Sequence, residues 1–198
     1  MTDFTTVKKN LESKRFRVSA FATAEEAADY LDRSIDGVSV GIGGSVTAEQ
    51  MGLYEKLSGH NRVFWHWRPE SAEDPRREAM TADMYITSVN GMAETGELIN
   101  IDGNGNRVAA IVYGPESVIV IAGMNKVVDS LDAAVERART VAAPQNKQRF
   151  DSKTPCEVTG VCADCKSDGC ICNQILITRN CNPPGRIKFI LVGEELGL

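Results

Sequence analysis

The stretch Gly37-Val38-Ser39-Val40-Gly41-Ile42-Gly43-Gly44-Ser45-Val46-Thr47 decides the fold class. Its first half is an apolar run of strand length, and the glycines follow at once. Thr47, with Gln50 three residues later, is expected to cap the helix that comes next. A strand that leads through a glycine loop into a helix is the first half of a βαβ unit, and such units build parallel sheets covered by helices.

Strand and helix signals alternate along the rest of the chain. Apolar and alternating runs predict further strands at residues 16–21, 62–67, 84–89, 97–101, 108–113, 118–121 and 186–192. Helical spacing predicts a helix capped by Thr23 and Glu26, and a long helix over 126–141 that Ala143-Pro144 ends. Asp102-Gly103-Asn104-Gly105 predicts a tight hairpin turn. We therefore expect an α/β fold: a mainly parallel sheet flanked by helices, with one antiparallel hairpin.

The chain has 198 residues, of which 42% are hydrophobic and 25% are charged, as in an ordinary globular protein. We expect an α/β domain over residues 1–150, then a Cys-rich metal-binding segment and a final strand over 151–198. A net charge of −5 disfavours nucleic acid as a partner. The polar start of the sequence and the lack of a long apolar run predict a cytoplasmic protein with no membrane segment.

The glycine loop is a candidate ligand site. Gly43 and Gly44 would let backbone amides approach an anion, and the hydroxyls of Ser45 and Thr47 could bind it as well. The loop lacks the lysine of ATPase phosphate loops and the third glycine of the dinucleotide fingerprint. It is therefore either an anion site or a plain turn from strand to helix.

A second group of polar residues lies between residues 82 and 107. Asn90 and Asn100 lie at the ends of predicted strands, where they could bind a substrate or satisfy loop backbone. Glu94 lies in a compact turn, as either a catalytic carboxylate or a residue that brackets the loop. Because both loops should leave the same edge of a parallel sheet, we expect Glu94 close to the glycine loop.

Six cysteines follow a cysteine-free stretch of 155 residues: Cys156, Cys162, Cys165, Cys170, Cys172 and Cys181. In a reducing compartment such clustering indicates metal or redox chemistry and not a disulfide framework. Thiolates suit an iron–sulfur cluster or zinc, and metal-free thiols or disulfides are the remaining alternative.

These motifs resemble those of the LUD, or lactate-utilization, domain family, which includes proteins related to lactate-utilization protein C. The resemblance spans nearly the whole chain. It is carried by Gly41–Ser45, by the run Ala82–Arg107, by Tyr113-Gly114-Pro115, by Ala122–Lys126, and by the tail from Pro155-Cys156 to Gly193-Glu194.

The resemblance implies a fold similar to that of phosphosugar isomerases and CoA transferases, and a link to lactate oxidation with iron–sulfur partner proteins. The Glu94 turn is similar to the place where CoA transferases hold a nucleophilic glutamate. The tail motif implies a 4Fe-4S cluster on four thiolates, those of Cys156, Cys162, Cys165 and Cys172. Cys170 and Cys181 depart from the motif, and either could substitute for a ligand. We expect neither to ligate, because Cys170 shares a face with Cys172 and two prolines stiffen the chain after Cys181.

Three functions follow. The first is a redox or accessory protein of lactate and organic-acid metabolism that carries the cluster. The second is a CoA-transferase-like or phosphosugar-isomerase-like enzyme that uses Glu94, with a structural zinc tail, and the third is a non-catalytic regulatory subunit. The expected partners are a small organic acid, a CoA ester or a phosphosugar, together with iron–sulfur lactate-oxidation subunits. The run Phe64-Trp65-His66-Trp67 is expected to pack in a core or at a homodimer interface.

Overall fold

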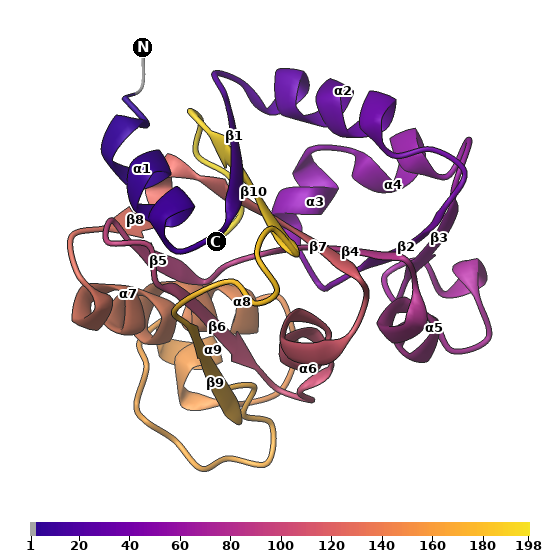
Figure 1. Cartoon of the computed structure of the whole chain (residues 1–198). Coiled ribbons are helices and arrows are strands. Elements are labelled where there is room, and N and C mark those ends of the chain that lie inside the picture. The colour runs from indigo at the N-terminus through magenta and orange to yellow at the C-terminus, as the bar shows by residue number, and fades with distance from the viewer. Residues whose placement is uncertain (1–2) are drawn as a thin grey trace.

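The main sheet is parallel throughout and occupies the centre of the molecule (Figure 1). A computed structural model describes residues 3–198, and within them the sheet has six strands in the order β1-β10-β7-β4-β2-β3. Their bounds are β1 Arg17–Phe21, β2 Ser39–Ile42, β3 Arg62–Trp65, β4 Met84–Ser88, β7 Ser117–Gly123 and β10 Ile187–Val192. The expected α/β fold with a mainly parallel sheet is confirmed.

A smaller second sheet has the order β8-β5-β6-β9. Its strands are β5 Gly91–Ala93, β6 Leu98–Asp102, β8 Val127–Val128 and β9 Gln174–Thr178. Strands β5 and β6 form an antiparallel hairpin, and β9 pairs antiparallel with β6. The hairpin therefore exists, but it turns between Ala93 and Leu98 and not at residues 102–105 as predicted.

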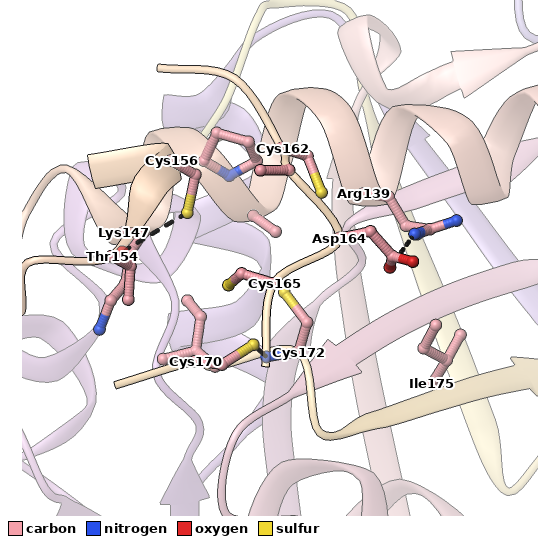
Figure 2. A pocket seen from close by; sticks show the side chains of 14 residues that line it. Arg139, Lys147, Thr154, Cys156, Cys162, Asp164, Cys165, Cys170, Cys172 and Ile175 are labelled. Atoms are coloured by element: carbon pink, nitrogen blue, oxygen red, sulfur yellow. Dashed lines mark hydrogen bonds and ion pairs between the residues drawn. The ribbon is translucent and has the colours of Figure 1, made fainter. Parts of the chain in front are cut away.

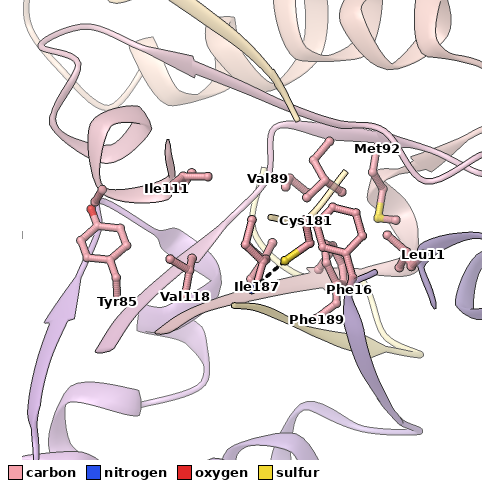
Figure 3. Packing of buried hydrophobic residues seen from close by; sticks show 14 of the residues in the cluster. Leu11, Phe16, Tyr85, Val89, Met92, Ile111, Val118, Cys181, Ile187 and Phe189 are labelled. Carbon is pink, nitrogen blue, oxygen red and sulfur yellow. Dashed lines mark hydrogen bonds between the residues drawn. The ribbon is translucent and has the colours of Figure 1, made fainter. Parts of the chain in front are cut away.

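Helices cover both faces of the main sheet. One face packs against α2 Ala24–Ser34, α3 Val46–Gln50 and α4 Leu53–Leu57. The other packs against α1 Thr5–Ser13, α5 Pro75–Thr81, α6 Asn106–Tyr113 and part of the second sheet (Figure 3). Strand β7 shows why both faces are apolar: Val118 and Val120 enter one core, and Ile119 enters the other.

Residues 108–113 were expected to form a strand, and that prediction is wrong because they belong to α6. Gly105 precedes this helix with a φ of 80°, and Asp102 Oδ2 accepts hydrogen bonds from the backbone N–H groups of Arg107 and Val108. Ala110 and Ile111 then bury one face of the helix against the sheet. A short apolar run fits a strand or a buried helix equally well, so the sequence did not separate them.

The long helix expected over 126–141 is also wrong. Residues 124–147 form the single turn η2 Met124–Lys126, then β8, α7 Leu131–Arg137, the π-helical segment η3 Ala138–Ala142, and α8 Ala143–Lys147. Pro144 lies in the first turn of α8, where a missing N–H costs little, so it does not end the helix. Similarly, Gly52, with a φ of 61°, separates α3 from α4.

The last fifty residues contribute to both sheets. After α9 Pro155–Thr159 and a loop, β9 joins the second sheet, and β10 lies between β1 and β7 inside the main sheet. The remaining single turn is η1 Pro69–Ser71. No helix in the described part of the chain is both long and apolar enough to cross a membrane.

Candidate functional site

The carboxyl ends of β2 and β4 border a crevice in the sheet edge. The chain leaves β2 toward β3 and leaves β4 toward the opposite side of the sheet, so the loops that follow diverge. A cavity of about 50 Å³ lies here, next to a larger one of about 430 Å³. The two share four lining residues: Gly44, Asn90, Arg107 and Asn146.

The glycine loop contributes to this crevice through its second half. Gly44, Ser45 and Thr47 line the small cavity. Gly43 instead packs inward, since an added Cβ would lie 2.8 Å from the Tyr85 hydroxyl, and its carbonyl accepts a hydrogen bond from the Trp65 indole at 3.0 Å. Ser45, and not Thr47 as predicted, caps α3, because Ser45 Oγ accepts from the backbone N–H of Ala48 at 3.2 Å.

Lys126 is the central group of the small cavity. Its side chain comes from the turn after β7, and its Nζ donates hydrogen bonds to Ser88 Oγ at 2.8 Å and to Thr47 Oγ1 at 3.1 Å. The residue is only 2% exposed. Burial, and then the charges of Arg137 and Arg107, lower the pKa of Lys126 to about 7. An amine with this pKa is partly uncharged at neutral pH.

Arg107 holds the walls of the crevice together. It donates to the carbonyl of Ser88 at 3.3 Å, to Asn90 Oδ1 at 2.9 Å and to the Ile101 carbonyl, and it lies 3.6 Å from Asp102. These contacts join the ends of β4 and β6 to the first turn of α6.

Asn90 and Asn100, the two asparagines predicted to bind a substrate or satisfy loop backbone, lie in different positions relative to the cavities. Asn90 lines both cavities, and its Oδ1 accepts from the backbone N–H of Ile101 as well as from Arg107. Asn100 is buried behind them and donates to the Ser88 carbonyl at 2.9 Å. In this structure Asn100 therefore satisfies loop backbone and does not line either cavity.

His66 lines the larger cavity, after the end of β3. Burial, together with the positive charge of Arg76, lowers the pKa of His66 to about 4, so the imidazole is neutral at pH 7. Trp65 and Trp67 stack with ring centroids 5.1 Å apart, and Trp65 is fully buried. The expected core packing of these aromatics is confirmed for Trp65.

A third cavity, of about 320 Å³, is lined by five of the six cysteines (Figure 2). Cys156 comes from α9, and four others come from the loop before β9: Cys162, Cys165, Cys170 and Cys172. Burial, and then the neighbouring Cys170 thiol, raises the pKa of Cys172 to about 12, whereas hydrogen bonds with Ser167 lower the pKa of Cys165. Across residues 3–198, no three His, Cys, Asp or Glu side chains are placed to hold a metal ion.

The cysteine cavity and the larger polar cavity share a wall, which is formed by Ala143, Lys147, Cys170 and Ile171. Cys170 accepts a hydrogen bond from the backbone N–H of Cys172 at 3.4 Å and lines both cavities. Cys181 lies elsewhere, buried in the core near Phe16 and Phe189 (Figure 3). Its Sγ donates to the Pro183 carbonyl and accepts from the backbone N–H of Ile187, each at 3.2 Å.

The family model of the LUD domain matches residues 5–192 of this sequence. The chain belongs to the LUD domain family. Membership places it among lactate-utilization-related proteins. No curated protein sequence matches it.

Two solved structures resemble this LUD domain. A DUF162 family protein from Deinococcus radiodurans is 14% identical over 95% of this chain and 94% of its own, with a TM-score of 0.53, and therefore shares the fold. Ribose 5-phosphate isomerase A from Methanocaldococcus jannaschii is 18% identical over 55% of this chain and 54% of its own, with a TM-score of 0.37.

In the LUD domain, Glu94 is not brought to the glycine loop. It is exposed in the turn between β5 and β6, where its backbone N–H donates to Val128 and its carbonyl accepts from the Asn10 side chain. Glu94 lines none of the three cavities described above. The expected proximity is wrong because β5 belongs to the second sheet and leads the chain away from the edge where β4 ends.

Lys126 and Arg107 are members of the site that were not predicted from the sequence. Lys126 was placed at the start of a helix and Arg107 beside a strand. One signal was available for Lys126, which stands three residues after the apolar strand β7, at the carboxyl end where parallel sheets bind ligands. Arg107 carried no such signal, since only the fold of α6 turns it toward Asn90.

Proposed function

We propose that this LUD protein carries an iron–sulfur cluster in the cysteine cavity and acts as a redox or accessory protein of organic-acid metabolism. The observation that carries the proposal is the convergence of five cysteines, from α9 and the following loop, on one cavity of about 320 Å³. Figure 2 shows their sulfur atoms around a common space. Four thiolates usually ligate such a cluster, and the cavity offers five.

The sequence of the cysteine segment favours a cluster over zinc. A structural zinc site usually combines two short Cys-x2-Cys knuckles, and this segment has one, Cys162-Ala163-Asp164-Cys165.

Four cysteines would hold the cluster, namely Cys156, Cys162, Cys165 and Cys172. When bound, the cluster supplies one-electron transfer. Lys147 also lines the cavity, and its positive charge would offset part of the negative charge of the thiolate-ligated cluster, whereas Arg139 is paired with Asp164 in the same lining. Cys170 would remain at the wall shared with the polar cavity, where a small organic acid is the proposed ligand. Iron–sulfur subunits of lactate oxidation are the proposed electron partners.

The alternative with Glu94 as the catalytic carboxylate receives no support from the geometry. Its side chain is exposed and lies outside the polar cavities that would hold a CoA ester or a phosphosugar. We therefore favour the cluster proposal over the alternative in which Glu94 is catalytic.

The test is anaerobic purification followed by iron and sulfide analysis and by EPR spectroscopy after reduction. We expect visible absorption and a signal from the reduced cluster. Single Cys→Ser variants at the four proposed ligands should lose iron, while Cys170→Ser should keep it. Cys181→Ala is the matched control, since this thiol lies in the core. A colourless, zinc-loaded protein, or a full cluster in Cys156→Ser, would refute the proposal.

A further inference from the structure

The Lys126 amine is buried with hydroxyl partners and no counter-ion. Nζ donates to Ser88 Oγ and Thr47 Oγ1, and no described residue from 3 to 198 forms an ion pair with it. The residue also lines the small cavity at the carboxyl edge of the sheet. A lysine in this setting can act as a nucleophile, because burial without a carboxylate favours the neutral amine.

We propose that Lys126 forms an imine with the carbonyl carbon of a small 2-oxo acid bound in this cavity. The Nζ lone pair attacks C2 of the acid, a C–N bond forms, and the carbonyl π electrons move to oxygen to give a carbinolamine. That oxygen then leaves as water with the two amine protons, and a C=N bond remains. The step is a condensation, so nothing is oxidised or reduced.

The lining of the cavity favours a carbonyl compound that carries a negative charge. Arg107 and Arg149 line the cavity together with the side-chain amides of Asn90 and Asn146. Asp102 lies 3.6 Å from Arg107 and Glu49 lies 3.8 Å from Arg149, and Leu198, whose backbone oxygen accepts from Arg137 at 3.4 Å, also lines the cavity. The positive charge in excess suits the carboxylate of the ligand.

The size of the site favours a short ligand. A cavity of about 50 Å³ has room for the reacting carbonyl and few further atoms, and the adjoining cavity of about 430 Å³ can hold the rest. The carboxylate next to the carbonyl would reach the arginines while C2 approaches the amine. A 2-oxo acid has both groups on adjacent carbons.

The protonation state of Lys126 agrees with this role. Its pKa of about 7 leaves about half of the amine uncharged at neutral pH, whereas an exposed lysine is almost entirely protonated. The cause is burial first and then the charges of Arg137 and Arg107. Asp102, Glu49, Arg149 and the neutral His66 are further titratable groups at this edge of the sheet, and Arg76, Lys147, Asp168 and Cys170 line the adjoining cavity.

Ser88 is the positioning residue for the amine. Its Oγ lies 2.8 Å from Lys126 Nζ and 3.3 Å from Thr47 Oγ1, so it holds the nitrogen at the cavity wall. The hydroxyl can also carry a proton from nitrogen to the departing oxygen. Ser88→Ala should therefore slow imine formation by roughly tenfold, with the same final yield of adduct.

The experiment is reductive trapping of the purified protein with pyruvate and borohydride, followed by peptide mass mapping. We expect one reduced pyruvate adduct per chain, on Lys126. Because the mapping identifies the lysine in the wild-type protein, the result does not depend on a variant that folds. Lys126→Met should lose the adduct at least tenfold, and Lys14→Met, which removes a half-buried lysine paired with Glu97 outside the three cavities, should keep it.

Two further arms define the ligand class. Acetone, which lacks the carboxylate, should give at least tenfold less adduct than pyruvate. Trapping of ribose 5-phosphate in preference to pyruvate would overturn the 2-oxo acid assignment. An adduct spread over exposed lysines, or none at Lys126, would overturn the proposal altogether. The proposal does not rest on the cluster, since the adduct is read by mass and the cluster by iron content and EPR.

Discussion

Replacing Arg107 with methionine should destabilise the protein and disorganise the polar crevice. The guanidinium donates to three acceptors, the Ser88 carbonyl, Asn90 Oδ1 and the Ile101 carbonyl, and it neighbours Asp102. Methionine fills much of the same volume but supplies no donor. The loss is therefore mainly electrostatic and not a packing defect.

The magnitude follows from the partners that remain. Ser88 keeps a hydrogen bond from Asn100, and Asn90 Oδ1 keeps one from the backbone N–H of Ile101. Between one and two hydrogen bonds from a charged donor are thus lost in net terms, each worth about 1.5–3 kcal/mol. We expect the free energy of unfolding to fall by about 3 kcal/mol. Removing one partner of a buried ion pair costs about 3–5 kcal/mol, so the expected loss lies at the lower end of that range.

Urea denaturation is the assay. With an m-value of about 2 kcal/mol/M, the midpoint should fall by roughly 1.5 M. Arg186→Met is the matched control, because Arg186 also donates to several carbonyls, those of Ile111, Ala110 and Pro115, away from the crevice. Both variants should lose stability, but only Arg107→Met should weaken pyruvate trapping. A midpoint shift below about 0.3 M for Arg107→Met would refute the reasoning.

Three further predictions concern packing and titration. Gly41→Ala should cost about 1–3 kcal/mol in thermal unfolding, because the new Cβ would lie 2.6 Å from the Ala79 carbonyl oxygen; no change would show that α5 can move aside. NMR should find His66 neutral down to about pH 5. Its pKa is about 4 in the folded protein and 6.5 in the unfolded chain, so the unfolded chain gains the proton first as the pH falls. The free energy of unfolding should therefore decrease between pH 6.5 and 4. Lys126 has a pKa of about 7 folded and 10.5 unfolded, so the unfolded state binds more protons between those values and stability should rise with pH there. Lys126→Met should flatten that rise, and an unchanged slope would contradict the lowered pKa.

Local sequence patterns were sufficient to predict most strands of the main sheet. Strands β2, β4, β7 and β10 are short apolar runs next to glycine or polar turns, and each lies close to its predicted place. Thr23 caps α2 as expected, its hydroxyl accepting from the backbone N–H of Glu26. These features depend on neighbours within a few residues, so a single sequence contains the information.

The errors share one physical cause. Residues 108–113 became α6 because Gly105 and Asp102 start a helix there and the sheet covers one of its faces, and Pro144 was tolerated because it entered a first helical turn. In both places the sequence permitted two local structures. Packing against distant elements chose between them.

The sequence by itself determined that the cysteines gather in one segment and that a glycine loop follows a central strand. Only the tertiary structure decided which of these residues meet. Five thiols line one cavity while Cys181 enters the core. Lys126 in η2, Ser88 at the end of β4 and Thr47 in α3 meet although they lie far apart in the sequence. Such groupings depend on strand order, and strand order follows from how helices and sheets bury their apolar faces across the whole chain.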